Sequence, residues 1–74
     1  MTSTLEALQP GVPAVVLEVR TTDQPVCLRL QELGLVAGTP VLVLSRQGGL
    51  MILVGEQRLC LSASLARAVD VLAL

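Results

Sequence analysis

The chain has 74 residues, of which 53% are hydrophobic and none is aromatic, and its formal net charge is −1. This aliphatic content excludes a disordered chain, because disordered segments combine low hydrophobicity with high net charge. All five basic residues are arginines scattered along the sequence, which argues against nucleic-acid binding, since that function normally needs a clustered basic stripe.

The first predicted elements are a helical turn and a strand. Residues 4–8 have the pattern of one helical turn, with Leu5 and Leu8 on one face. A Pro-Gly pair then breaks this turn. Residues 12–20 are rich in β-branched side chains, which favours an extended strand.

A helix is predicted over residues 24–33. Asp23 belongs to a turn that supplies a candidate N-cap, and Pro25 falls near the first helical position, where a missing N–H is tolerated. At about 100° per residue, one stripe of the helix is apolar and should face the core; it comprises Val26, Leu30 and Leu33. Leu28 lies on the far side among polar residues, and two interpretations stay open: a leucine tolerated at the surface, or a contact for another chain.

Two glycines frame the exit from this helix. Gly34 occupies the place where a residue in the left-handed conformation commonly ends a helix, and Gly38 precedes the next β-branched run. We expect both glycines to set where the helix ends and the strand begins, without any chemical role.

Three extended runs follow, over residues 39–46, 50–54 and 57–61. Paired glycines separate the first two runs, and paired glycines between apolar runs are a hairpin signal, because glycine adopts positive φ without strain. A further glycine turn leads into the third run. These residues therefore predict a three-stranded meander.

The chain ends with a short helical turn and a strand. Ser62 is the expected cap of the turn over residues 63–68, and residues 69–74 form the last extended run. Five short strands without βαβ spacing predict a mainly β fold, a small antiparallel barrel. We expect a single domain over residues 1–74.

Two of the predicted strands are apolar on both faces. Residues 41–44 and 50–54 contain no polar side chain, whereas a half-buried strand should alternate apolar and polar residues. A small barrel has one interior, so some of these side chains should be exposed, and exposed apolar patches usually mark interfaces. We interpret the excess as self-association or partner binding; cover by the two short helical segments is the alternative.

The sequence has almost no reactive chemistry. It lacks histidine, the usual general base and the commonest nitrogen ligand for metals, and two cysteines cannot complete a four-ligand zinc site. Cys27 and Cys60 are far apart and form no CxxC pair, so reduced, buried thiols are expected, with a disulfide or a reactive thiol as alternatives. We therefore predict a non-enzymatic interaction module with no catalytic residue, cofactor or metal.

The sequence also bears on location. No secretory signal is visible at the N-terminus, where Glu6 stands in place of an apolar core. The longest strongly apolar stretch, residues 33–45, is too short to span a bilayer, which needs about twenty apolar residues. We expect a soluble, cytoplasmic protein that does not insert directly into a membrane.

Three motifs together suggest a family. They are Leu-x-x-Leu-x-Pro-Gly from Leu5, Arg-Leu-x-x-Leu-Gly-Leu-x-x-Gly-Thr from Arg29, and Val-Gly-x-x-Arg-x-x-Leu from Val54. Their order and spacing over nearly the whole chain resemble ferrous iron transport protein A, the FeoA family. The resemblance implies an SH3-like barrel in the bacterial cytoplasm. It also implies an accessory, regulatory role in ferrous iron uptake, in which the protein binds the cytosolic part of the FeoB transporter and does not carry iron.

By analogy with this family, the partner surface is expected around the helix and its exit, at Leu28, Arg29, Leu30, Leu33 and Leu35. Leu28, Arg29 and Leu35 are the favoured contacts, since the helical stripe already assigns the other two leucines to the core. Two other functions stay open. The same fold forms the C-terminal domain of iron-dependent repressors resembling the diphtheria toxin repressor, so the chain could be a stand-alone regulatory module of that kind. It could also be a self-assembling module with another partner.

Overall fold

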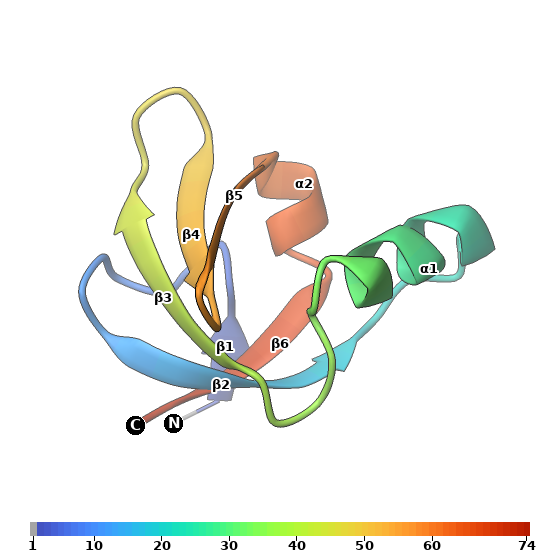
Figure 1. The fold of residues 1–74 in the computed structure, drawn as a ribbon, viewed down its shortest axis with the longest axis horizontal. Helices are drawn as coiled ribbons and strands as arrows, with labels where there is room; N and C mark the ends of the chain where they lie inside the picture. Colours follow the sequence, from blue (N-terminus) through green and yellow to red (C-terminus); the bar gives the residue numbers. More distant parts are fainter. Residues whose placement is uncertain (1) are drawn as a thin grey trace.

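The structure, a computed structural model that describes residues 2–74, is built on one six-stranded antiparallel sheet. The strands are β1 (Thr2–Thr4), β2 (Pro13–Val19), β3 (Pro40–Ser45), β4 (Leu50–Val54), β5 (Gln57–Leu61) and β6 (Val69–Ala73). They lie in the order β1-β6-β2-β3-β4-β5. Two helices, α1 (Gln24–Glu32) and α2 (Ala63–Ala66), gather at one side of the curved sheet (Figure 1). Neither helix within the described residues is long and apolar enough to cross a membrane.

The structure confirms the elements predicted after residue 12, with ends shifted by one or two residues. Both helices begin at the expected caps. The Asp23 carboxylate accepts a hydrogen bond from the Val26 N–H at 3.2 Å, and the Ser62 hydroxyl accepts one from the Leu65 N–H at 3.3 Å. These side chains satisfy N–H groups that the first turn of a helix leaves free, which is why the sequence alone located both starts.

The structure has six strands where five were expected, because β1 was not predicted. Its three short polar residues show no apolar alternation, and they become extended by pairing with β6, where Thr2 lies opposite Leu72 and Thr4 opposite Asp70. The expected N-terminal turn follows β1. Leu5 and Leu8 are both buried there, as predicted.

The core is aliphatic, and residues 2–74 bury no polar or charged side chain. Along the strands, buried and exposed positions alternate. On β3, for example, Val41 and Val43 are buried while Leu44 stays 39% exposed. On β4, Ile52 is buried while Met51 stays 37% exposed. The two strands that are apolar on both faces therefore leave aliphatic side chains on the outer surface, which the short helices do not cover.

The expectation of two buried thiols is wrong. Cys27 is half-buried on α1, Cys60 is exposed on β5, and both are free thiols. Cys27 lies off the apolar stripe of α1, so it does not reach the core. Cys60 lies opposite Met51 at an outward-facing position of β5, where the alternation of the strand turns its side chain to solvent.

Candidate partner-binding groove

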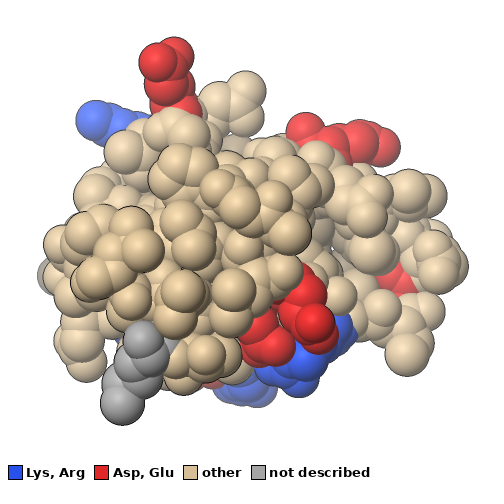
Figure 2. All heavy atoms as spheres, turned by 90° about the horizontal axis from the view of Figure 1, so that it is seen from below, with Lys and Arg blue, Asp and Glu red and all other residues tan. Residues whose placement is uncertain are grey.

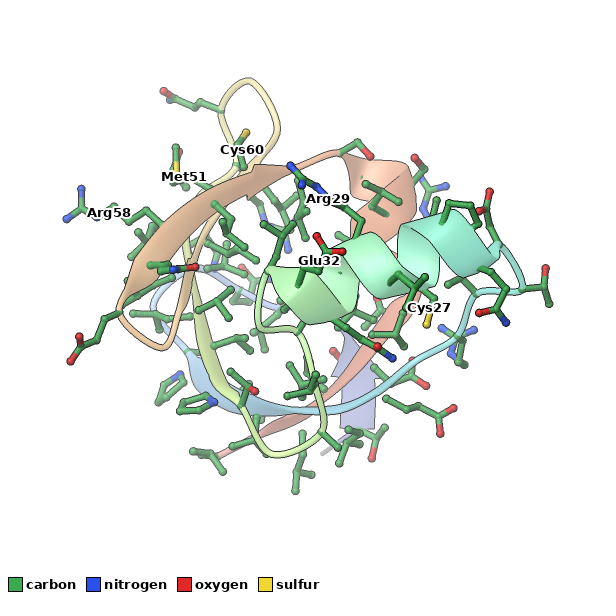
Figure 3. The ribbon with its side chains drawn as sticks, turned by 45° about the vertical axis from the view of Figure 1, so that its right-hand side comes forward. Cys27, Arg29, Glu32, Met51, Arg58 and Cys60 are labelled. Atoms are coloured by element: carbon green, nitrogen blue, oxygen red, sulfur yellow. The ribbon has the colours of Figure 1, made fainter. Side chains whose placement is uncertain are left out.

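An open groove of about 380 Å³ lies between α1, β5 and α2. We call it the α1–β5 groove; its lining residues are Pro25, Val26, Arg29, Leu30, Leu33, Cys60, Leu61 and Leu65. Seven of these eight side chains are uncharged. Arg29 is the exception, and it extends from α1 toward β5 and Cys60 at the mouth of the groove (Figure 3).

The helical wall of the groove follows from the apolar stripe of α1. Leu30 is 1% exposed and anchors the helix in the core, whereas Val26 and Leu33 are partly exposed and line the groove. The Asp23 cap and Pro25 fix where the helix begins. Local sequence thus sets which side chains share the stripe, and burial of Leu30 turns the stripe toward the core.

The end of α1 is fixed by two backbone hydrogen bonds. The Leu35 N–H donates to the Leu30 carbonyl and the Gly34 N–H donates to the Gln31 carbonyl, both at 2.9 Å. This is the Schellman arrangement, which requires a left-handed residue after the last helical turn. Gly34 supplies it with φ of +93°. The chain then turns inward and buries Leu35 completely.

The opposite wall comes from residues that are distant in sequence. Leu61 ends β5, Ser62 caps α2, and Leu65 on α2 then faces α1 across the groove. β5 is also the last strand in the sheet order, so one side of its backbone has no strand partner within the described residues. An edge strand beside an apolar groove is a surface on which an extended peptide can bind.

The structure places only three of the five predicted contact residues in the groove. Arg29, Leu30 and Leu33 line the groove, although Leu30 is almost wholly buried. Leu28 is 55% exposed but is not part of the groove lining. The expectation that Leu35 is a favoured contact is wrong, because its side chain is 0% exposed. A residue two positions after a Schellman helix end commonly packs back onto the helix, and that signal was available in the sequence.

Five groove residues were not among the predicted contacts. Two of them, Pro25 and Val26, lie on the predicted helix, and the other three come from distant segments: Cys60, Leu61 and Leu65. Their local pattern predicts only the end of a strand and a short helical turn. They meet α1 because the sheet curves back, which no local signal reveals. Gly38, the second glycine considered at the helix exit, has φ of +90° and lies outside the groove.

Metal donors do not gather in this structure. Among residues 2–74, no three His, Cys, Asp or Glu side chains form a group that could hold a metal ion. The groove itself contains one thiol, that of Cys60, and one cation, that of Arg29. Its chemistry is therefore suited to binding apolar side chains beside an anionic group.

A family model described as the FeoA domain matches residues 3–72. A search of curated proteins gave no match. Among solved structures, an iron uptake regulatory protein (FeoA) is 28% identical, with a TM-score of 0.90 over 100% of this chain and 99% of its own.

Two further structures are similar. Stenotrophomonas maltophilia FeoA, solved in complex with zinc, is 29% identical, with a TM-score of 0.81 over 97% of this chain and 89% of its own; it is described as an SH3 domain protein and suggested to act as a bacterial ferrous iron transport activating factor. A manganese-dependent transcriptional repressor, 20% identical, shares the fold with a TM-score of 0.88 over 99% of this chain and 42% of its own. The mainly β, SH3-like fold is confirmed, and the chain belongs to the FeoA family.

Proposed function

We propose that this protein is a non-enzymatic accessory factor of bacterial ferrous iron uptake, which works in the cytoplasm by binding the cytosolic part of a FeoB-type transporter. Membership of the FeoA family supports the link with ferrous iron transport. The suggested activating role of the S. maltophilia relative supports a regulatory function. The lack of histidine in the sequence supports a role without acid–base catalysis. The proposal treats residues 1–74 as a single domain.

The observation that carries the proposal is the α1–β5 groove. Its apolar lining and single cation, Arg29, favour a partner segment with aliphatic side chains and an acidic residue placed against the guanidinium. Burial of apolar side chains in the groove would supply most of the affinity, and the charge pair would fix the orientation. Among residues 2–74, no three His, Cys, Asp or Glu side chains form a group that could hold a metal ion, and the proposal contains no metal.

A calorimetric titration of the transporter's purified cytosolic domain with this protein tests the proposal. The decisive variant is Arg29→Glu, and Arg58→Glu is its matched control. Both arginines are exposed, but Arg58 lies on β5 opposite Leu53 and outside the groove lining. The two variants therefore have the same change of net charge and differ in its location.

We expect the wild type and Arg58→Glu to bind with similar affinity and Arg29→Glu to bind at least tenfold more weakly, a loss of about 1.4 kcal/mol. No binding by the folded wild type would refute the accessory role with this partner. Equal weakening by both variants would show that only net charge matters, and the groove would then not be the binding site.

A further inference from the structure

The α1–β5 groove runs beside the side of β5 that has no strand partner within the described residues, which we call the free edge. In the ribbon, β4 lies on one side of β5 and α1 lies on the other (Figure 1). A segment that binds in the groove therefore meets the main chain of β5 as well as apolar side chains. The main-chain groups at this edge bear on which conformation the bound segment adopts.

The turn between β4 and β5 fixes which main-chain groups point to the free edge. Two residues, Gly55 and Glu56, join the strands, and only Gly55 has a positive φ, of +58°, as in a type II′ turn. The flanking residues Val54 and Gln57 lie opposite each other. Such a pair closes the turn by exchanging both hydrogen bonds, and bonded and non-bonded pairs then alternate along the ladder. Gln57 and every second residue after it therefore direct their N–H and C=O groups to β4.

The residues between them, Arg58 and Cys60, direct their N–H and C=O groups to the free edge. Among residues 2–74, neither residue makes a backbone hydrogen bond outside the pairing with β4. The edge thus presents two donors and two acceptors beside an apolar groove. A helix laid in the groove would take these groups out of water without offering them partners, which is unfavourable. An extended segment would satisfy all four groups by pairing with β5.

The charges near this edge disfavour a second copy of the chain as the occupant. β5 carries one charged residue, Arg58, and no acidic one. If two β5 strands paired antiparallel about a twofold axis at Leu59, Arg58 of each copy would lie opposite Cys60 of the other. Arg29 extends toward Cys60 (Figure 3), so arginines of the two copies would come together, and like charges placed opposite each other are destabilising.

The same charges favour an acidic partner. Within the described part of the chain, the two ion pairs involve other arginines, Arg20 and Arg67, and none involves Arg29. On the face seen from below, basic and acidic side chains lie against each other (Figure 2). The Arg29 guanidinium is not neutralised in this way, so it can receive a carboxylate from a partner at the mouth of the groove.

We propose that the transporter's cytosolic part supplies an extended segment that adds as a strand to the free edge of β5. This inference rests on the proposed function and specifies the conformation and pattern of the bound segment. Side chains alternate in direction along a strand, so every second residue of the segment faces the groove and should be aliphatic. An acidic residue of the segment lies against Arg29. The main-chain groups of Arg58 and Cys60 hold the segment, and the side chain of Arg58 takes no part.

Two substitutions of one residue test the inference by calorimetric titration of the transporter's purified cytosolic domain. Cys60→Pro removes the N–H that points to the free edge, and proline is tolerated in an edge strand where that N–H faces solvent. Cys60→Ala is the matched control, because it removes the same thiol and keeps the N–H. We expect Cys60→Ala to bind like the wild type and Cys60→Pro to bind at least tenfold more weakly. Equal affinity of the two variants, whether retained or lost, would overturn the inference.

Amide hydrogen exchange of the wild type gives a second readout that does not depend on the folding of the proline variant. In the free protein, the Arg58 and Cys60 amides should exchange fast and the Leu59 amide, which is bonded to β4, slowly. In the complex, the exchange of Arg58 and Cys60 should slow at least tenfold. A complex in which both amides still exchange fast would refute strand addition and leave the accessory role intact. No complex with the folded wild type would refute the accessory role, and this inference with it.

Discussion

The backbone N–H of Leu35 donates a hydrogen bond to the carbonyl oxygen of Leu30 at 2.9 Å, and both side chains are buried in the core. This contact closes the end of α1 and attaches the helix to the sheet through two leucines five positions apart. One wall of the α1–β5 groove depends on it, because Arg29 and Leu33 take their positions from the last turn of the helix.

Replacing Gly34 with alanine should destabilise the protein by about 1 to 2 kcal/mol, because its φ of +93° is unfavourable for a residue with a Cβ atom. A Cβ atom there would also contact the Val54 side chain at 3.4 Å. Urea unfolding measures the loss. Gly38→Ala is the control for backbone strain alone, since its φ is +90° and no atom lies within 4 Å of the added carbon. A Gly34→Ala variant as stable as the wild type would contradict this account of the helix end.

Leu35 and Leu28 should differ sharply when each is replaced with alanine. Leu35 is 0% exposed, so its truncation leaves a cavity and should cost about 2 to 5 kcal/mol. Leu28 is 55% exposed, and its truncation should change the free energy of unfolding by no more than about 0.5 kcal/mol. Denaturant unfolding of the two variants compares them directly. Equal losses would mean that the helix exit does not pack as the structure shows.

The start of α1 should depend on the Asp23 side chain. Asp23→Ala removes the oxygen that accepts from the Val26 N–H and should destabilise the protein by about 1 kcal/mol. Asp23→Asn retains an acceptor oxygen and should lose only a few tenths of a kcal/mol. Thermal unfolding separates the two. If asparagine is as damaging as alanine, the negative charge near the helix N-terminus matters more than the hydrogen bond.

Leu28 allows a test of the two interpretations that the sequence left open. We expect Leu28→Arg to fold normally, since the side chain is exposed, and to bind the transporter's cytosolic domain several-fold more weakly than the wild type. The effect should be smaller than that of Arg29→Glu, because Leu28 is outside the groove lining. The same calorimetric titration measures it. Unchanged affinity would make Leu28 a leucine tolerated at the surface.

Much of this fold could be predicted from the sequence because its signals are local. The Asp23 and Ser62 caps act within three residues, and Gly34 acts through its own φ angle. The strands that follow glycine turns were placed to within two residues, since β-branched runs and turn residues are read within short windows. The scarcity of reactive side chains and the FeoA motifs could also be recognised without a structure, because both are properties of the sequence alone.

Only the tertiary structure decided the rest. β1 is extended through its pairing with β6, and the curvature of the sheet brings Leu61 and Leu65 to α1. Cys60 is exposed because it lies opposite Met51 on the outer face of β5. The register of the sheet, which sets Leu42 between Pro13 and Leu53, is likewise decided by long-range pairing. The physical reason is that a local pattern states which side chains share a face of one element. Long-range pairing determines which elements those faces meet.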